Sequence, residues 1–344
     1  MKNNRRQFIV TITLACLSTP LFGMKEKLLQ EEKIYPSVLK PAALEHGDTI
    51  AISSPAGAVW EEEQVEKFIS IIQDLGFKVK RGLTLKEKFG YFAGTDELRA
   101  KEINDFFSDK EVNAIFCMKG GWGCARILDK LDYNSIKNNP KVIMGFSDIT
   151  SLLIALNSKT GLVTFHGPVG NSGWNDFTVD YVKRILIEKE KVTYAYPGDD
   201  TDKQYTITAG KATGIVVGGN LTVIASMIGS DYLPDWKNKI LFLEETGEEP
   251  YRIDRMLTQL KLAGVFKNIS GLVFGKCVKC EAEEPEKAFT LQQVLEQQIK
   301  PLGIPAFYGA MIGHIVNKYT VPIGINAEMD ASDGMIKLIE SAVV

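Results

Sequence analysis

Histidine is scarce in this chain: its 344 residues include three, His46, His166 and His314. Cysteine is scarce too, and the Cys-x-x-Cys pair of Cys277 and Cys280 has no second Cys/His pair at the spacing of a structural zinc site. No glycine-rich stretch carries the Gly-Lys-Ser/Thr signature of a phosphate loop. We therefore predict neither a metal nor a cofactor.

An excess of positive charge is also lacking. The chain has 40 Lys and Arg residues against 43 Asp and Glu residues, a formal net charge of −3. Proteins that bind nucleic acids usually carry a basic patch or stripe, so we expect no nucleic-acid partner. The composition is 45% hydrophobic and 24% charged, which is ordinary for a globular chain long enough for two domains.

Long apolar runs are missing as well. The N-terminal run, residues 8–22, is several residues shorter than the about 20 that a transmembrane helix needs. Lys2, Arg5 and Arg6 precede it, and a basic flank before a short apolar segment is typical of an export signal. We predict an export signal over residues 1–23, a periplasmic location and no stable membrane insertion after its removal. Twin-arginine and general secretory export both fit, and an uncleaved buried helix is the alternative.

The Cys-x-x-Cys pair has two interpretations. In an oxidising compartment, Cys277 and Cys280 can join in a disulfide. Two unpaired structural thiols fit the sequence equally well, so the pairing stays open.

Short strand-like segments alternate with amphipathic helices in the first half of the chain. In the segment 61–75, four apolar residues fall on one helical face, and a glycine follows at the C-cap position. Thr95 can cap the next helix, and residues 125–131 are expected to form another. The alternation predicts a parallel sheet covered by helices, in an N-terminal domain over residues 41–170.

The second half changes character. Residues 171–205 are rich in Gly, Asn and Asp around a single helix and are predicted to be a linker. A C-terminal domain is predicted over residues 206–344, with Pro250 at the start of a helix and an antiparallel pair at 325–339.

The junction at residues 142–150 has the pattern of a nucleophile elbow. A strand-like run meets a glycine, an aromatic residue and a serine, and a helical pattern begins at Asp148. Such a turn exposes the serine hydroxyl beside backbone N–H groups, which makes Ser147 a candidate nucleophile. Gly145 leaves room for the tight turn. A helix N-cap is the alternative role for Ser147.

A serine nucleophile needs a base and an acid. His166 and His314 each follow a strand-like segment, and the pattern of residues leaves the two even as the base. Glu244 ends an apolar strand, where an unpaired carboxylate would be costly to bury, so it is the candidate acid. The acidic residues directly after it, Glu245 among them, are expected to face solvent.

A glycine-rich loop, Lys-Gly-Gly-Trp-Gly at residues 119–123, leaves one strand and opens the next helix. The backbone N–H groups of Gly120 and Gly121 could complete an oxyanion hole. A purely structural turn is the alternative.

Five motifs follow one another along the chain: residues 119–128, 144–150, 218–221, 243–245 with 251–257, and 313–314. In their order and spacing they resemble those of the LD-carboxypeptidase family of serine peptidases. The family includes muramoyltetrapeptide carboxypeptidases and microcin self-immunity proteins, and the resemblance runs from about residue 41 to the C-terminus.

The resemblance implies that Ser147 is the nucleophile, Glu244 the acid and His314 the base, so it selects between the two histidines. It also implies that Asp148 and the loop at 120–121 hold the oxyanion. The implied fold is a flavodoxin-like N-terminal domain and a smaller β-rich α/β C-terminal domain, with the active site between them. Members of the family are commonly homodimers and need no metal.

Two residues depart from the family pattern. Lys119 stands where arginine is frequent, and Trp122 stands where tyrosine is usual. We expect both, together with His166, to line the cleft as substrate-binding residues. The departures therefore bear on substrate preference rather than on the chemistry.

The expected function is that of a serine carboxypeptidase that cleaves the L,D-peptide bond holding the terminal D-alanine of a murein tetrapeptide. Arg252 or Arg255 is a candidate partner for a substrate carboxylate, although on an amphipathic helix a solvated or ion-paired role is favoured. One alternative is an amidase of acyl-aminoacyl nucleotides, with Trp174 as an aromatic platform for the base. The other is an exported protein that binds a solute without chemistry.

Overall fold

The computed structural model describes residues 36–198 and 204–344. The predicted export signal, residues 1–23, lies outside the described residues. In the described ranges we find no helix with the length and apolar content that a bilayer crossing requires.

Within the described residues, the first sheet has six strands in the order β2-β1-β3-β4-β5-β12. They are β1 (Thr49–Ser53), β2 (Lys78–Arg81), β3 (Ala114–Cys117), β4 (Val142–Gly145), β5 (Thr164–His166) and β12 (Val321–Ile323). Strands β1 to β5 run parallel, whereas β12 is antiparallel to β5. The order 2-1-3-4-5 is that of a flavodoxin-like sheet, so the predicted fold of the first half is confirmed. Strands β3 and β4 are buried along their whole length, as parallel strands covered on both faces should be.

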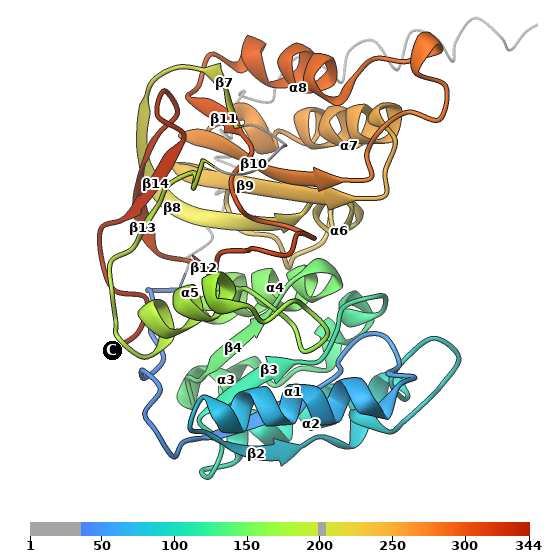
Figure 1. Cartoon of the computed structure of the whole chain (residues 1–344), viewed down its shortest axis with the longest axis vertical. Coiled ribbons are helices and arrows are strands. Elements are labelled where there is room, and N and C mark those ends of the chain that lie inside the picture. The colour runs from blue at the N-terminus through green and yellow to red at the C-terminus, as the bar shows by residue number, and fades with distance from the viewer. Residues whose placement is uncertain (1–35, 199–203) are drawn as a thin grey trace, which may run out of the picture. The chain divides into compact units, whose positions relative to one another are not determined.

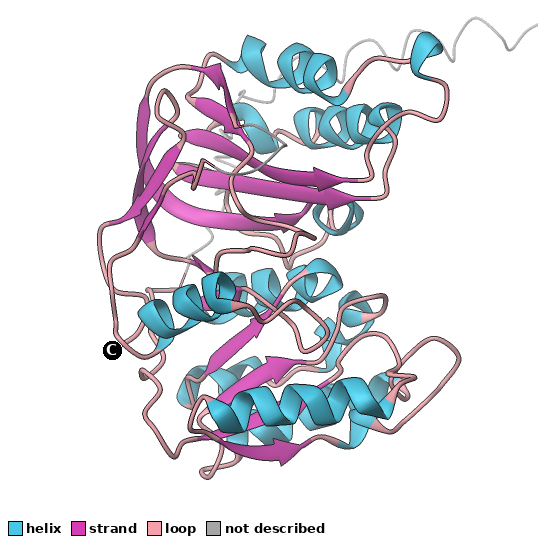
Figure 2. Ribbon diagram, in the orientation of Figure 1, coloured by secondary structure: helices cyan, strands magenta, loops and turns pink. Residues whose placement is uncertain are grey.

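Four helices connect strands β1 to β5 (Figure 2): α1 (Glu62–Asp74), α2 (Asp96–Ser108), α3 (Tyr133–Asn138) and α4 (Thr150–Thr160). A fifth, α5 (Asp176–Leu186), follows β5 and leads to the second sheet. The hydroxyl of Thr95 accepts from Leu98 N and caps α2, as predicted. The segment expected to be helical at 125–131 is a 3₁₀ helix, Cys124–Lys130, rather than an α-helix. It starts directly after Gly123, which has a φ of 114°, and no side chain caps it, so this segment stays a short connector.

The second sheet has eight strands in the part of the chain that the structure describes, in the order β6-β14-β13-β8-β9-β10-β11-β7. They are β6 (Thr193–Tyr194), β7 (Tyr205–Thr208), β8 (Lys211–Asn220), β9 (Lys239–Thr246), β10 (Gly271–Val278), β11 (Ala306–Tyr308), β13 (Asn326–Asp330) and β14 (Met335–Leu338). The central strands β8 to β11 are parallel, and antiparallel strands flank them on both sides. The predicted closing pair at 325–339 is confirmed as β13 and β14.

Three helices accompany the second sheet: α6 (Leu221–Ser226), α7 (Pro250–Leu262) and α8 (Leu291–Ile299). The side chain of Asn220 accepts from Val223 N and caps α6. Pro250 occupies the first turn of α7, as predicted, because its missing N–H has no intrahelical partner to lose there. Leu257 and Leu260 of α7 are fully buried against the apolar strands of the sheet.

The two sheets share parts of the chain. Strand β12 comes between β11 and β13 in sequence but pairs with β5 of the first sheet. Helix α4 lies between the sheets, and the hydroxyl of Thr150 at its start accepts from Asn220 N at the end of β8 (Figure 1). The exact domain bounds, with a linker at 171–205, stay a prediction, and β6 places part of that linker in the second sheet.

Candidate active site

Ser147 occupies a strained position between β4 and α4. Its φ is 64°, in the left-handed region that residues with a side chain seldom adopt. Its hydroxyl makes no hydrogen bond within the described residues and caps no helix, so the N-cap interpretation is wrong. A Cβ on Gly145 would lie 2.8 Å from Ile149 Cγ2, which explains why the turn needs glycine there. The backbone therefore forms the predicted elbow and leaves the hydroxyl available.

The glycine loop faces this serine directly. A Cβ on Gly120 would lie 3.1 Å from Ser147 Oγ and 3.2 Å from the backbone nitrogen of Asp148. The N–H groups of Gly120 and Gly121 have no backbone acceptor within the described ranges. The backbone of the loop thus lies beside the hydroxyl and beside Asp148 N, where an oxyanion hole needs its donors.

The side chain of Asp148 fixes the distance between the elbow and the glycine loop. Its Oδ2 accepts from Cys124 N, at the end of the loop, at 2.9 Å. Burial raises the pKa of the Asp148 carboxyl, while the hydrogen bond from Cys124 acts in the opposite direction. A buried carboxylate with a backbone donor is a rigid tie between the two segments.

Arg99 holds the same loop from α2. The side chain is fully buried, and its guanidinium donates to Gly123 O at 2.9 Å and to Pro55 O at 2.6 Å. It also pairs with Asp96. Sequence reasoning did not find Arg99, because one arginine in an amphipathic helix gives no sign that it is buried.

His314 and Glu244 form a pair although 70 positions separate them. His314 Nδ1 lies 2.8 Å from Glu244 Oε2. Glu244 is fully buried near the end of β9, and among the described residues its Oε1 has no hydrogen-bond partner. Burial raises the pKa of Glu244, but the hydrogen bond and charge of His314, with smaller contributions from His166 and Asn220, together outweigh burial and leave the pKa below its ordinary value. A Cβ on Gly313 would lie 3.1 Å from the same Oε2, so glycine permits this close approach.

Phe146 connects this pair to the elbow. Its ring centroid lies 4.8 Å from that of His314, and Ser147 is the next residue. The ring of His166 packs edge-on against both Phe146 and Phe242. His166 is 2% exposed, and burial lowers its pKa to about 4, so it is neutral near pH 7. The substrate contact expected of His166 stays a prediction.

The other predicted substrate-binding residues differ in their surroundings. Lys119 is half-buried, and its ammonium donates to Ala58 O at 3.2 Å. Trp122 is 68% exposed on the glycine loop. Trp174, the candidate platform for a base, is half-buried and packs on Phe68 with ring centroids 5.3 Å apart.

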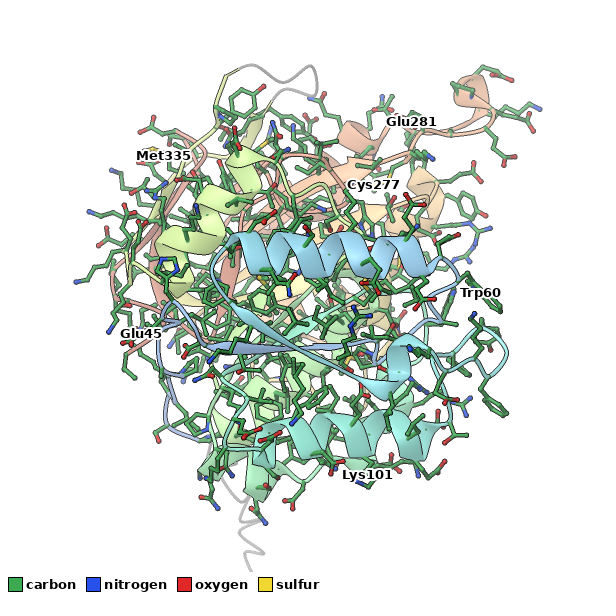
Figure 3. All side chains as sticks on the ribbon, turned by 60° about the horizontal axis from the view of Figure 1, so that its bottom comes forward. Glu45, Trp60, Lys101, Cys277, Glu281 and Met335 are labelled. Atoms are coloured by element: carbon green, nitrogen blue, oxygen red, sulfur yellow. A yellow bond between two sulfur atoms is a disulfide. The ribbon has the colours of Figure 1, made fainter. Side chains whose placement is uncertain are left out.

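Exposed aromatic side chains gather on the loops beside the glycine loop. Trp60, Phe89, Tyr91 and Trp122 are each more than half exposed, and Figure 3 shows Trp60 at the outer edge of the molecule. A backbone hydrogen bond from Gly57 N to the glycine loop holds the Trp60 segment next to it. We call these four side chains the aromatic rim.

Glu245 is not a solvent-facing residue, so that expectation is wrong. It is 2% exposed and accepts from Asn220 Nδ2, Thr222 N and Thr246 N. The N-terminus of α6 offers unpaired N–H groups, and the carboxylate of Glu245 satisfies one of them.

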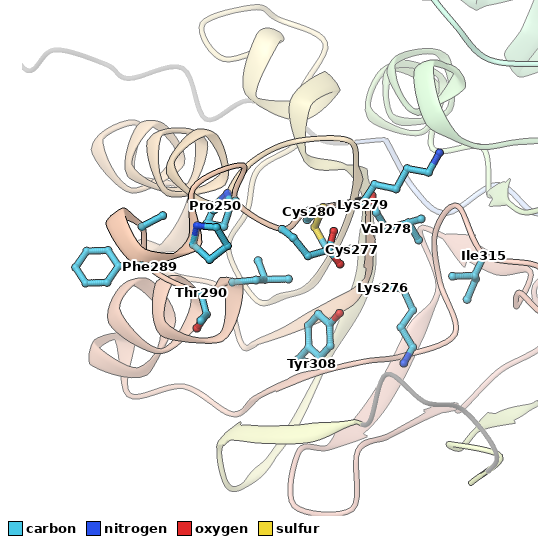
Figure 4. Close-up of a pocket in the computed structure, with 15 residues that line it drawn as sticks. Pro250, Lys276, Cys277, Val278, Lys279, Cys280, Phe289, Thr290, Tyr308 and Ile315 are labelled. Carbon is cyan, nitrogen blue, oxygen red and sulfur yellow. Dashed lines mark hydrogen bonds between the residues drawn. A yellow bond between two sulfur atoms is a disulfide. The ribbon is translucent and has the colours of Figure 1, made fainter.

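Cys277 and Cys280 are joined in a disulfide, which decides the question that the sequence left open. The bond borders a cavity of about 630 Å³ between β10 and the segment before α8 (Figure 4). Tyr308 and Ile315 also line this cavity, whereas Ser147 does not. In the described part of the chain, no group of three or more His, Cys, Asp or Glu residues could hold a metal ion.

Lys318 is a further buried polar residue that sequence reasoning missed. It is 5% exposed, and its ammonium lies 4.1 Å from the ring centroid of Phe146. The available signal was a single lysine between His314 and the apolar segment of β12. A lysine in that position is readily taken for a surface residue.

The site combines a strained serine, a glycine loop against that serine, and a histidine–glutamate pair whose histidine contacts the ring of Phe146. These are the parts of a serine-type hydrolase. The glycine loop, Ser147 and Glu244 lie near the carboxyl ends of β3, β4 and β9. His314 lies in the loop between β11 and β12 rather than directly after a strand, as the sequence had suggested.

Comparisons with known proteins agree with this class. Models of the LD-carboxypeptidase N-terminal and C-terminal domains match residues 50–167 and 213–329. The chain is 37% identical over 302 residues to the probable murein peptide carboxypeptidase of Bacillus subtilis (strain 168), covering 86% of this chain and 92% of that one. It is 30% identical over 339 residues to the microcin C7 self-immunity protein MccF of Escherichia coli, covering 89% and 96%.

A solved structure is similar as well. The muramoyltetrapeptide carboxypeptidase from Oxalobacter formigenes superposes with a TM-score of 0.75 at 28% identity, covering 84% of this chain and 97% of that one. The chain belongs to the LD-carboxypeptidase family.

Proposed function

We propose that this protein is a serine carboxypeptidase that removes the terminal D-alanine of murein tetrapeptides by cleaving an L,D-peptide bond. Family membership and the murein-related names of its relatives support this substrate class. The observation that carries the proposal is the left-handed Ser147, with its hydroxyl against the glycine loop. A residue is held in such a strained conformation when the surrounding structure requires it, and these positions cluster at active sites.

In the proposed mechanism, Ser147 Oγ attacks the scissile carbonyl while His314 takes the hydroxyl proton. Glu244 keeps the proton of His314 on Nδ1 and stabilises the imidazolium that forms. The N–H groups of Asp148 and of the glycine loop stabilise the oxyanion, and one such donor is typically worth about 3–4 kcal/mol. His314 then gives its proton to the leaving nitrogen of D-alanine, and water releases the acyl group from Ser147.

The decisive experiment is mass spectrometry of a murein tetrapeptide incubated with purified protein. We expect the mass of one alanine residue to be lost, with free D-alanine as product. The Ser147→Ala variant should leave the peptide intact, and Ser158→Ala, a serine on α4 that donates to Leu233 O, should cleave it normally. Cleavage by the Ser147→Ala variant would overturn the proposal.

A second candidate is an amidase of acyl-aminoacyl nucleotides. The 30% identity to MccF favours it, and the aromatic rim offers rings on which a base can stack. An aminoacyl-sulfamoyl adenosine, offered in parallel with the tetrapeptide, separates the two. A solute-binding protein without chemistry is disfavoured by membership of a peptidase family.

We also propose that the protein is exported and forms a homodimer. The disulfide between Cys277 and Cys280 supports an oxidising compartment, since such bonds rarely persist in the cytosol. Cell fractionation with sequencing of the mature N-terminus tests export, and light scattering of the purified protein tests the dimer.

A further inference from the structure

The ammonium of Lys318 is buried next to the elbow. Its Nζ lies 4.1 Å from the ring centroid of Phe146, the residue before Ser147. The ring of His314 contacts the same phenylalanine. The ring of Phe146 thus has both the buried ammonium of Lys318 and the candidate base, His314, as neighbours.

Lys318 has few partners for a buried charge. An ammonium has three donors, but within the described residues Lys318 Nζ makes a single hydrogen bond, to Ser172 Oγ at 3.5 Å. It forms no ion pair there, although the nearby charge of Glu244 favours its protonated form. Burial lowers the pKa of Lys318 to about 8, so the side chain is mostly charged at pH 7. An unpaired buried cation is costly, and an anionic ligand would offset that cost.

The loop that carries Ser172 lies at the same edge of the first sheet as the glycine loop. Gly170 N donates to Cys117 O and Asn171 N donates to Met118 O, directly before the glycine loop. Asn175 Nδ2 also donates to Asn317 Oδ1, next to Lys318. Lys318 therefore lies where the loops after β3 and β5 meet the segment that follows His314.

The other candidate cations have different partners. Arg252 forms an ion pair with Glu248, and both Arg252 and Arg255 contact the ring of Tyr251 on α7. Lys119 donates to Ala58 O. None of these contacts includes the elbow or the phenylalanine beside it.

We propose that Lys318 binds the terminal carboxylate of the substrate and thereby restricts cleavage to the last peptide bond. This inference rests on the proposed carboxypeptidase function. In such a substrate the carboxylate is one residue from the scissile carbonyl, so a cation beside the elbow is suitably placed. The hydroxyl of Ser172, which accepts from Lys318, has its own proton available for the same carboxylate.

The test compares two substrates that differ in one group: a tetrapeptide ending in D-alanine and the same peptide ending in D-alaninamide. Wild-type protein should cleave the acid about 10- to 100-fold better in kcat/KM, as expected for a hydrogen-bonded charge. In Lys318→Met, kcat/KM for the acid should fall by about that factor and kcat/KM for the amide should not change. The ratio of the two rates is independent of how much of the variant is folded.

Lys141→Met is the matched control. Lys141 is 8% exposed, its pKa is also lowered to about 8 by burial, and its ammonium donates to Phe106 O and Asp109 O, away from the elbow. This variant should keep the wild-type ratio of acid to amide cleavage.

The outcomes separate this proposal from the function on which it rests. If wild-type protein cleaves acid and amide equally, or Lys318→Met keeps the wild-type ratio, Lys318 does not bind the carboxylate and the carboxypeptidase function stands. If wild-type protein cleaves neither peptide, the proposed function fails, and the role of Lys318 fails with it.

Discussion

Gly120 and Ser147 approach so closely that a methyl group on Gly120 would lie 2.9 Å from the Cβ of Ser147 and 3.1 Å from its hydroxyl oxygen. Two loops that follow different strands of the first sheet thus share the space next to the candidate nucleophile. The same methyl group would lie 3.2 Å from Asp148 N, where an oxyanion would bind.

Gly120→Ala should therefore abolish most activity while the protein stays folded. We expect kcat/KM to fall by about 100- to 1,000-fold, the usual effect of losing oxyanion stabilisation. Gly47→Ala is the control, because Gly47 has a φ of 93° and no atom within 4 Å of the added methyl group. That variant should lose about 1 kcal/mol of stability from backbone strain and keep its kcat/KM. D-alanine release and thermal unfolding measure the two effects, and normal activity in Gly120→Ala would contradict the placement of the oxyanion.

Adjacent glutamates should behave differently when each becomes glutamine. Glu244→Gln removes the charge that faces His314, and we expect kcat to fall by about 100- to 10,000-fold, as when the acid of a triad becomes an amide. Glu245→Gln should keep kcat but lower the free energy of unfolding by about 1–3 kcal/mol, because an amide NH₂ would face the donors of Thr222. Kinetics and urea unfolding of both variants make the comparison. If Glu244→Gln and Glu245→Gln lost kcat equally, Glu244 would have no role in catalysis that its neighbour lacks.

His166 should make the folded state sensitive to acid. Its pKa is about 4 when folded against about 6.5 when exposed, so the unfolded chain binds a proton more readily between these values. Above pH 6.5 the ring is neutral in both the folded and the unfolded chain, so it does not change stability. As the pH falls from 6.5 towards 4, the free energy of unfolding decreases by about 1.4 kcal/mol per pH unit. In His166→Gln this loss should be absent. Urea unfolding at pH 7, 5.5 and 4.5 gives the free energy of unfolding of the wild-type protein and of His166→Gln. If His166 has a purely structural role, the difference between the two free energies will not change with pH.

The disulfide should stabilise the chain modestly. Closing so short a loop, Cys277 to Cys280, lowers the entropy of the unfolded chain by an amount worth about 2 kcal/mol. Replacing both cysteines by serine should lower the free energy of unfolding by about that amount. A reductant should lower the stability of the wild-type protein similarly and leave the double variant unaffected. Cys117 and Cys124, which are free and buried, serve as internal controls that alkylate only on unfolding.

Local signals made much of the fold predictable. Short stretches of sequence predict the cap at Thr95, the proline at the start of α7 and the apolar face of α1. They do so because residues three and four positions apart lie on the same face of a helix. The elbow at Ser147 is local as well, since a strand, a glycine and a helix start follow one another there. Its role as nucleophile stays a prediction with strong geometric support.

Contacts between distant segments were not predictable from composition or spacing. The resemblance to a known family was needed to select His314 over His166. The pairing of His314 with Glu244 joins the loop between β11 and β12 to a residue near the end of β9, 70 positions away. Glu245 is buried although its polar neighbours in sequence suggested exposure. The neighbours of Lys318 and Trp174 in sequence gave no sign that Lys318 is buried or that Trp174 packs on Phe68.

By itself, then, the sequence determined the alternation of strands and helices in the first half and the candidate serine, and the resemblance to a known family supplied the flavodoxin-like fold. Only the tertiary structure decided that β12 joins the first sheet, that Cys277 and Cys280 pair, and that Phe146 has His314 and Lys318 as neighbours. The physical reason is that strand pairing and side-chain packing join residues whose separation along the chain carries no periodic signal.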